Sequence, residues 1–320
     1  MKIVILDAHV ANPGDLSWDG LKAFGELTVY PRTPAAETVA RIGDAEAVYT
    51  NKVIIDRAVI EACPNLKFIG VLATGYNVVD IDAARARGIA VCNIPAYSTP
   101  DVVQMTFALL LDICFNVAKH SASVRAGEWA ACPDFSYTVS PLIELSGRTL
   151  GIIGYGRIGQ AVSRVASAMG MYVLCNSRHR TATDLPANCR YADLDEIFEK
   201  SDVISLHCPL NDSTKGIVNR ESIARMKDGV IILNTGRGPL VVEQDLADAL
   251  NSGKVYAAGV DVVSAEPISE DNPLLTAKNC VITPHIAWAP LAARERLVNI
   301  AVGNLAAWVK GAPVNDVTRL

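Results

Sequence analysis

A glycine-rich turn constrains the fold of this chain more than any other feature. The segment Gly154-Tyr155-Gly156-Arg157-Ile158-Gly159 follows the apolar run 149–153 and precedes a helical segment, 160–169. In such a unit the first glycine permits a tight turn, the second lets backbone approach a pyrophosphate, and the third allows close packing of helix on strand. The segment predicts a βαβ unit that binds a dinucleotide at a helix N-terminus, with a purely structural turn as the alternative.

Short β-rich runs alternate with helical segments along the whole chain, which is the pattern of parallel sheets in α/β folds. The runs lie at 3–6, 47–50, 68–71, 89–92, 149–153, 172–175, 203–207, 230–234, 257–260 and 281–283. A chain of 320 residues exceeds the size at which one hydrophobic core stops growing. We expect two Rossmann-like, doubly wound α/β domains: a discontinuous substrate-binding domain, 1–100 plus 288–320, and a dinucleotide-binding domain, 101–287.

Two long helices and one irregular segment complete this outline. Residues 102–118, which follow a capping Asp101, are too apolar to face water on any side, so we interpret them as a buried helix that crosses between domains. Residues 292–309 form a second helix. The segment 125–146 contains Trp129, Phe135 and Tyr137 without helical or strand periodicity. It predicts a loop whose aromatic side chains need a partner surface.

Composition excludes several classes of protein. A net charge of −5 without any cluster of Lys or Arg argues against nucleic acid. No apolar run reaches the roughly 18 residues of a membrane span, and the N-terminal run is too short for a signal peptide. Eight cysteines are scattered without C-x-x-C or metal-ligand spacing. We expect reduced core thiols, no metal, and a cytoplasmic protein that acts on small molecules.

The residues after the second strand of the dinucleotide-binding domain bear on the choice of cofactor. Asn176 stands where an NAD-selective site usually has Asp or Glu for the ribose 2′-hydroxyl. Ser177, Arg178, His179 and Arg180 follow it, and such a neutral-to-basic set suits a 2′-phosphate better than a carboxylate would. The sequence slightly favours NADP(H), with NAD(H) possible if the arginines are merely solvated.

Three later segments resemble the D-isomer-specific 2-hydroxyacid dehydrogenase family. They are residues 234–238 (Asn-Thr-Gly-Arg-Gly), residues 259–261 (Gly-Val-Asp) with Glu266-Pro267, and residues 284–287 (Pro-His-Ile-Ala). Residues 72–77 (Leu-Ala-Thr-Gly-Tyr-Asn) are similar to the family's N-terminal substrate loop, so the resemblance covers the whole chain. It implies a fold of the formate/glycerate dehydrogenase type, an active site in the cleft between two domains, and a homodimer. The C-terminal part is most similar to hydroxypyruvate and glyoxylate reductases.

The resemblance also assigns the chemistry. Reduction of a 2-oxo acid adds a hydride to the carbonyl carbon, and the oxygen then needs a proton from a group that holds one near neutral pH. His285 matches that group and Glu266 its carboxylate partner, while Arg237 would grip the substrate carboxylate with a planar cationic fork. Taken singly, each has a structural alternative: a core histidine, a surface turn, and one of many surface cations.

The remaining site residues also rest on the resemblance. Backbone N–H groups at Ala73, Thr74 and Gly75 would cradle the substrate carboxylate. Asp261 would hold the nicotinamide carboxamide, with a helix cap as the alternative. Other predicted cofactor contacts, besides the glycine turn and residues 176–178, are His207, Cys208, Pro209, Thr214, Thr235, Gly236 and His285. We expect Cys208 to serve in packing rather than as a nucleophile.

The predicted substrate loop lacks a basic residue, which limits the choice of substrate. Val71, Leu72 and Ala73 are apolar where relatives that oxidise phosphoglycerate carry a basic residue, which disfavours a phosphorylated substrate; Asn77 departs from the usual Asp. The sequence predicts reduction of hydroxypyruvate to D-glycerate or of glyoxylate to glycolate. The alternatives are a broad-specificity 2-oxo acid reductase and a dinucleotide-sensing binding protein of the corepressor type, which can retain the same three residues.

Overall fold

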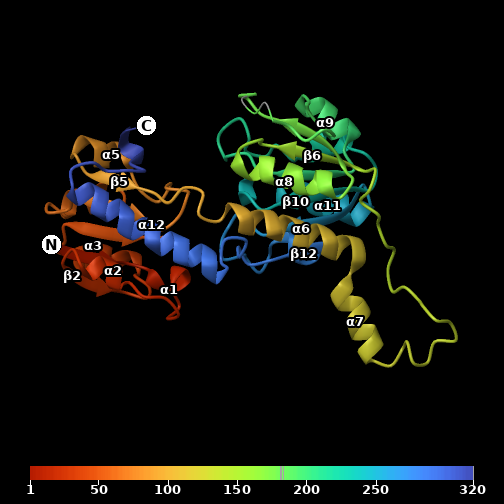
Figure 1. Ribbon diagram of the computed structural model, residues 1–320, viewed down its shortest axis with the longest axis horizontal. Coiled ribbons are helices and arrows are strands. Elements are labelled where there is room, and N and C mark those ends of the chain that lie inside the picture. The colour runs from red at the N-terminus through yellow and green to blue at the C-terminus, as the bar shows by residue number, and fades with distance from the viewer. Residues whose placement is uncertain (181, 183, 320) are drawn as a thin grey trace. The chain divides into compact units, whose positions relative to one another are not determined.

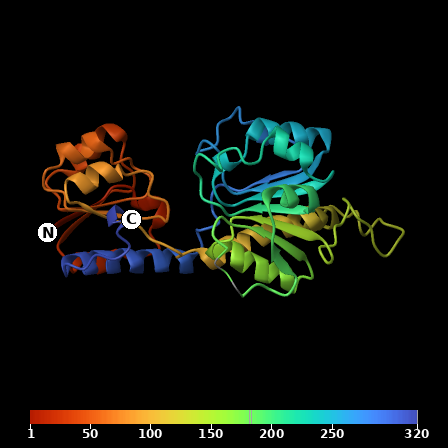
Figure 2. The ribbon, with the colours of Figure 1, turned by 90° about the horizontal axis from the view of Figure 1, so that it is seen from above.

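The computed structural model describes residues 1–180, 182 and 184–319. The chain divides into two compact units: unit 1 holds Met1–Ser98 and Ala289–Leu320, and unit 2 holds Thr99–Trp288. Each unit contains a parallel sheet flanked by helices (Figures 1 and 2). This is the two-sheet, Rossmann-like α/β architecture that the alternation of apolar runs predicts.

Unit 1 is built on a sheet with the strand order β2-β1-β3-β4-β5, in which every described pair is parallel. Helix α12 (Leu291–Val309) returns the end of the chain to this sheet. The Tyr49 hydroxyl donates to the Ala301 carbonyl over 2.9 Å, and the rings of Phe68 and Trp308 lie 5.3 Å apart. The strands are β1 (Lys2–Ile5), β2 (Glu26–Val29), β3 (Ala47–Thr50), β4 (Phe68–Val71) and β5 (Ala90–Cys92), and the shorter helices are α1 (Ala8–Ala11), α2 (Asp19–Lys22), α3 (Thr38–Ile42), α4 (Arg57–Ala62) and α5 (Ile81–Ala86).

Unit 2 is built on a parallel sheet with the order β12-β11-β10-β9-β6-β7-β8. Apolar side chains fill two cores, one formed with α6 and α8 and the other with α9, α10 and α11. Strands buried on both faces explain the nearly continuous apolar runs in the sequence. The strands are β6 (Thr149–Ile153), β7 (Tyr172–Asn176), β8 (Cys189–Tyr191), β9 (Val203–Leu206), β10 (Val230–Asn234), β11 (Val255–Val260) and β12 (Cys280–Ile282), and the helices are α6 (Thr99–Phe115), α7 (Val117–Arg125), α8 (Arg157–Ala168), α9 (Leu194–Lys200), α10 (Arg220–Arg225) and α11 (Glu243–Ser252).

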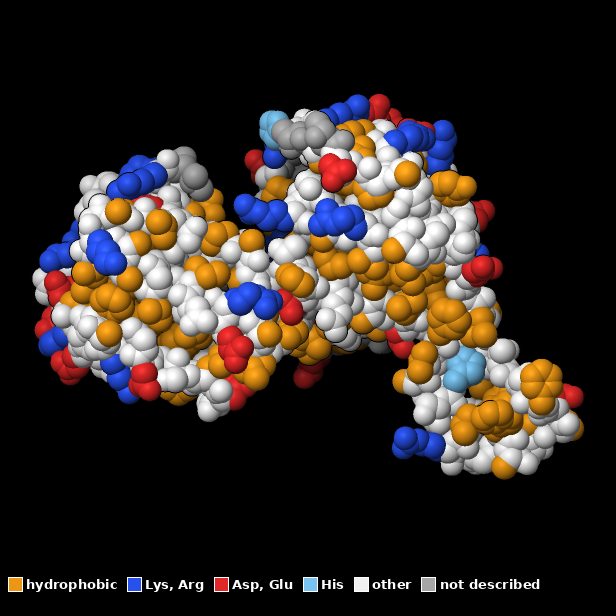
Figure 3. All heavy atoms as spheres, viewed as in Figure 1, with side chains coloured by type: hydrophobic (Ala, Val, Ile, Leu, Met, Phe, Trp, Pro, Cys, Tyr) orange, Lys and Arg blue, Asp and Glu red, His pale blue; other side chains and the backbone are white. Residues whose placement is uncertain are grey.

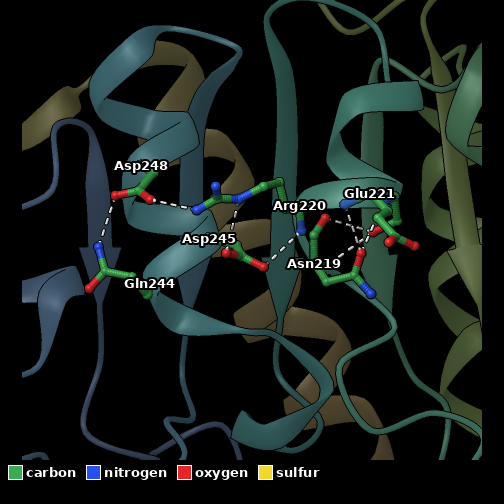
Figure 4. Close-up of polar contacts among 7 residues, drawn as sticks. Asn219, Arg220, Glu221, Gln244, Asp245 and Asp248 are labelled. Carbon is green, nitrogen blue, oxygen red and sulfur yellow. Dashed lines mark hydrogen bonds and ion pairs between the residues drawn. The ribbon is translucent and has the colours of Figure 1, made fainter.

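Polar contacts brace the start of α10 against α11 (Figure 4). The Asn219 side chain accepts hydrogen bonds from the backbone N–H groups of Glu221 and Ser222, which satisfies free donors at the helix start. Arg220 contacts the carboxylates of Asp245 (3.5 Å) and Asp248 (3.3 Å) on α11. Because the Arg220 side chain is exposed, these ion pairs add little to the stability of the unit.

Several elements differ from the sequence prediction. The helix predicted over 102–118 runs instead from Thr99 to Phe115, so Asp101 lies in its first turn rather than at its cap. It belongs wholly to unit 2, and Phe115 is 42% exposed, so one side does face water. Asn116, in the left-handed region (φ +46°), separates α6 from α7. Helix α8 begins at Arg157 rather than at residue 160, and the edge strands β2 and β8 were not predicted.

Helix α7 and the loop that follows extend away from the rest of unit 2 (Figure 1). We refer to residues 117–146 as the arm. Trp129 is 51% exposed and Phe135 is 91% exposed, although the Trp129 indole N–H donates to the Phe135 carbonyl over 3.0 Å. Among the described residues no single helix is long and apolar enough to cross a membrane; α6 and α7 together would pass by length and composition but are bent by 51°.

Candidate active site

The glycine turn between β6 and α8 leaves room for a ligand at one of its three glycines. A Cβ at Gly154 (φ +102°) would lie 2.3 Å from the Cys208 nitrogen, and one at Gly159 would lie 2.3 Å from the Gly154 oxygen. Close backbone packing therefore requires both glycines. A Cβ at Gly156 would meet no described atom within 4 Å.

Gly156 is also the N-cap of α8 and offers no side-chain cap to that twelve-residue helix. The first N–H groups of the helix thus face open space beside a residue that has no side chain. Free N–H donors and the positive end of the helix dipole suit an anion, and the space suits close approach of a phosphate. The residues at this turn fit the pyrophosphate of a dinucleotide.

The two arginines that follow β7 have different surroundings. Arg180 contacts Asp193 over 3.1 Å and lies over the Tyr191 ring. Arg178 is exposed and, among the described residues, pairs with no carboxylate. The last residue of β7, Asn176, has an amide in place of a carboxylate, and this amide donates to the Ala192 carbonyl over 3.0 Å. Arg178 is the cation that remains available to an anionic ligand here.

The loop after β9 packs against the glycine turn, where the Cys208 backbone lies close to Gly154. The His207 Nε2 lies 2.8 Å from the Ser205 hydroxyl, and burial lowers the pKa of His207 to about 4, which keeps the imidazole neutral. Burial raises the pKa of Cys208 to about 11, so this side chain stays a thiol, as expected of a packing residue. The Thr214 hydroxyl donates to the Pro209 carbonyl over 2.7 Å and closes the loop.

Strands β10, β11 and β12 are parallel neighbours, so their carboxyl ends meet at one edge of the sheet. At the end of β10, the buried Asn234 side chain donates to the Arg237 carbonyl (2.9 Å) and accepts from the Gly236 N–H (3.1 Å). Arg237 donates to the Gly236 carbonyl, and its guanidinium contacts no carboxylate among the described residues. The Thr235 hydroxyl lies 3.2 Å from that of Thr106 on α6. The loop thus presents an exposed cation on a fixed backbone.

His285 and Glu266 meet at the same edge of the sheet. The His285 Nδ1 lies 2.7 Å from the Glu266 Oε2, and their side chains are 29% and 32% exposed. The Glu266 Oε1 accepts a hydrogen bond from the Val263 N–H over 3.3 Å. Because a carboxylate faces Nδ1, that nitrogen carries a hydrogen, and Nε2 is left to exchange a proton with a substrate.

Asp261 binds residues on both sides of His285. Its side chain is buried, and it accepts from the Thr283 hydroxyl (2.6 Å), the Ile286 N–H (2.9 Å) and the Ala287 N–H (2.8 Å). His285 itself has a left-handed backbone (φ +53°), which is uncommon for a residue with a side chain. The helix-cap alternative for Asp261 is wrong, because no helix is present in the described segment 262–272.

The predicted substrate loop lies in unit 1, at the carboxyl end of β4. Val71 and Leu72 are fully buried, so their side chains do not line a surface and say nothing about the substrate. Ala73, Thr74 and Gly75 are at least partly accessible. Among the described residues, no acceptor takes the backbone N–H of Ala73, Thr74 or Gly75. These three N–H groups are available to an anion.

Sequence reasoning did not find two residues that shape the site: Asn234, which orders the Arg237 loop, and Thr283, which binds Asp261. Each is the polar last residue of a predicted strand, 230–234 and 281–283, and polar residues at strand ends gather at one edge of a parallel sheet. That position was the available signal.

Comparison with known proteins shows the family of this chain. The family described as D-isomer specific 2-hydroxyacid dehydrogenase, NAD binding domain, matches residues 107–287. A hydroxypyruvate reductase of Blautia hydrogenotrophica is 58% identical, with all of both chains covered. The crystal structure of the TT0316 protein of Thermus thermophilus matches with a TM-score of 0.88 at 35% identity, covering 99% of this chain and all of that one.

An acyclic imino acid reductase, Bsp5, in complex with NADPH and D-Arg also matches, with a TM-score of 0.87 at 29% identity, 99% of this chain and all of that chain. The match over residues 107–287 spans more than half of the sequence, and the Blautia relative spans all of it. A nicotinamide dinucleotide is therefore the cofactor, and the reaction is an oxidation or reduction at the CH–OH carbon of a 2-hydroxy acid. The chain belongs to the D-isomer-specific 2-hydroxyacid dehydrogenase family.

Proposed function

We propose that this enzyme reduces hydroxypyruvate to D-glycerate or glyoxylate to glycolate, with His285 as the proton donor. The observation that carries the proposal is the contact between the His285 Nδ1 and the Glu266 carboxylate at 2.7 Å. The most similar relative reported above, a hydroxypyruvate reductase at 58% identity over the whole chain, supports the choice of substrate.

The bound dinucleotide supplies the hydride that the carbonyl carbon receives. The His285 imidazolium gives its Nε2 proton to the carbonyl oxygen, and the neutral ring keeps its Nδ1 hydrogen on the Glu266 side. Arg237 binds the substrate carboxylate and polarises the carbonyl group. The N–H groups of Ala73, Thr74 and Gly75 also bind the carboxylate. Asp261 holds the backbone around His285 and would orient the nicotinamide carboxamide.

The first experiment measures kcat/KM for hydroxypyruvate, glyoxylate, pyruvate and a bulky 2-oxo acid, each with NADPH and with NADH. We expect the first two acids to be the best substrates. A preference for the bulky acid would favour a broad-specificity reductase. Binding of the dinucleotide without turnover of any acid would favour a silent binding protein and would contradict the proposal.

Substitution at the site tests the assigned roles. His285→Ala should lower kcat by about 10²- to 10⁴-fold, because it removes the proton donor, and should leave the dissociation constant of NADPH nearly unchanged. Arg237→Lys should chiefly raise KM, because an ammonium group cannot form the planar two-point contact. Wild-type kinetics in either variant would remove that residue from its role.

We also propose a preference for NADPH, with Arg178 binding the 2′-phosphate. No carboxylate competes for Arg178 among the described residues, whereas Arg180 is already paired with Asp193. Arg178→Ala should lower the ratio of kcat/KM for NADPH to that for NADH by about tenfold or more, since a charge-assisted hydrogen bond is worth about 1.5–3 kcal/mol. Arg180→Ala is the matched control and should change the ratio little. Equal kcat/KM for the two cofactors in the wild type would contradict this preference.

We further propose that the arm binds a second copy of this chain. Figure 3 shows hydrophobic side chains gathered on the arm, and Phe135 is almost fully exposed. A hollow of about 440 Å³ lies where the arm rejoins unit 2, lined mainly by apolar residues that include Leu111, Phe115 and Leu142. Apolar surface gathered in this way marks a site of protein–protein contact. Sedimentation should show a dimer, and Phe135→Ser should weaken it; a concentration-independent monomer would contradict the proposal.

A further inference from the structure

The three consecutive carbonyl groups of Leu72, Ala73 and Thr74 are each bound by a different donor. The Asn51 side-chain amide donates to the Leu72 carbonyl over 2.7 Å, and the Asn93 side-chain amide donates to that of Thr74 over 2.8 Å. The backbone N–H of Ile94 donates to the Ala73 carbonyl over 3.0 Å. All the acceptors of this short segment are thus occupied, while the N–H groups of Ala73, Thr74 and Gly75 have no acceptor among the described residues.

Asn51 is itself held by an acid at the end of the neighbouring strand. The Asp7 carboxylate accepts the backbone N–H groups of Asn51 (2.7 Å), Lys52 (2.6 Å) and Val53 (3.1 Å). The Asn51 side chain is buried, so its amide has a fixed direction. A chain of contacts therefore runs from the end of β1, through the end of β3, to the Leu72 carbonyl.

Asn93 is held by the end of the chain. The buried Asn304 of α12 donates to the Asn93 carbonyl over 2.9 Å, and its Oδ1 accepts from the Asn315 side chain over 2.8 Å. The Asn93 N–H donates to the Asn315 carbonyl over 3.1 Å. These contacts fix Asn93 from two sides, and Asn93 in turn fixes Thr74.

We propose that Asn51 and Asn93 are positioning residues for substrate binding: by holding the Leu72 and Thr74 carbonyls, they aim the Ala73 and Gly75 N–H groups at the substrate carboxylate. This inference rests on the proposed function. Rotation of a peptide group moves its C=O and N–H together, so a tied carbonyl fixes the N–H of the next residue. A donor that is fixed before binding loses less entropy when the anion arrives.

The test compares Asn51→Ala and Asn93→Ala with Asn12→Ala. Asn12 is a matched control, because it is 8% exposed against 6% for Asn51 and 9% for Asn93, lies in the same unit, and orders only residues 14–16. We expect KM for hydroxypyruvate or glyoxylate to rise about tenfold in the first two variants, the effect of one lost hydrogen bond. The dissociation constant of NADPH should not change, and Asn12→Ala should keep the wild-type KM.

Hydrogen exchange provides a readout that does not depend on turnover. The N–H groups of Leu72 and Ile94, which donate to Thr50 and Ala73, should exchange faster in Asn51→Ala and Asn93→Ala but not in Asn12→Ala. If an alanine variant does not fold, Asn51→Ser or Asn93→Ser, which keeps a shorter donor, should show a smaller change in the same direction. Wild-type exchange and wild-type KM in both site variants would overturn the inference. If the wild type reduces no 2-oxo acid, the proposed function fails, and exchange alone then decides whether the two asparagines fix the segment.

Discussion

At the scale of single residues, His285 owes its orientation to two carboxylates that act on different parts of it. Asp261 is buried and binds the backbone N–H groups that follow the histidine, whereas Glu266 is partly exposed and faces the ring. The Asp261 carboxylate fixes the backbone from which the His285 side chain projects. The Glu266 carboxylate determines which ring nitrogen carries the hydrogen. Neither acid can replace the other, because the groups they bind differ.

Asp261→Asn should therefore destabilise the protein as well as slow it. An asparagine keeps the shape but turns one acceptor into a donor that faces a backbone N–H, and an unsatisfied buried donor costs about 1–3 kcal/mol. We expect the free energy of unfolding in urea to fall by this amount and kcat to fall with it. Thr283→Val, which removes only one of the three donors, should have a smaller effect. Wild-type stability of Asp261→Asn would show that these contacts do not hold the loop.

His207 predicts how stability depends on pH. Burial lowers the pKa of the folded state to about 4, from an ordinary value near 6.5, so the unfolded chain binds more protons between these values. Stability contributed by the neutral imidazole is present above pH 6.5 and is lost as the pH falls toward 4, by up to about 3 kcal/mol. His207→Asn should flatten this part of the curve of unfolding free energy against pH. An equally steep curve in the variant would assign the loss to other groups.

Most of the candidate site residues could be named from the sequence, because the glycine turn and the segments around Arg237 and His285 are local patterns. The contacts that hold them could not. Asp261 binds residues 22 to 26 positions further along the chain, and Asn93 is bound by Asn304, more than two hundred positions away. An asparagine or aspartate at a strand end shows that a polar contact exists but not which backbone it reaches.

At the scale of elements, different glycines of the turn serve packing and ligand binding: Gly154 is required by close backbone packing, and Gly156 leaves space for the ligand. Gly154→Ala should destabilise the protein by several kcal/mol, since its Cβ would lie 2.3 Å from a backbone nitrogen and its φ is +102°. Gly156→Ala meets no described atom, so it should leave the unfolding free energy nearly unchanged and raise the dissociation constant of NADPH. Calorimetry and a fluorescence titration measure the two effects. Similar losses of stability in both variants would contradict this division of roles.

The elements that sequence reasoning missed lie at sheet edges and at a helix break. Residues 26–29 (Glu-Leu-Thr-Val) are largely exposed in the edge strand β2, and the edge strand β8 has only three residues, so neither forms an apolar run. Asn116 ends α6 in place of a proline or glycine, and although asparagine also adopts the left-handed conformation, it is a weaker signal for a helix end. The central strands, buried on both faces, were predicted within two residues of their observed ends.

At the scale of the whole molecule, the predicted dinucleotide contacts all lie in unit 2. A ligand that binds only the folded state stabilises it by mass action, by about 2.7 kcal/mol at a hundred times its dissociation constant. NADPH should therefore raise the temperature of the thermal transition that includes unit 2. The same concentration of NADPH should raise the transition temperature of the Gly156→Ala variant much less. An unchanged transition in the wild type would mean that the dinucleotide binds weakly or not at all.

The discontinuity of unit 1 also has a consequence for how the protein is made. Tyr49 and Phe68 emerge from the ribosome early, but Ala301 and Trp308, which they contact, are synthesised only after residues 99–288. At about 5–20 residues per second, that delay is roughly 10 to 40 seconds. Throughout this time the contacts of α12 with β3 and β4 are missing, while unit 2 can fold as soon as its own chain is complete. The second unit in the sequence is thus the first to be finished. Tyr49 and Phe68 gain their contacts with α12 only after unit 2 is complete.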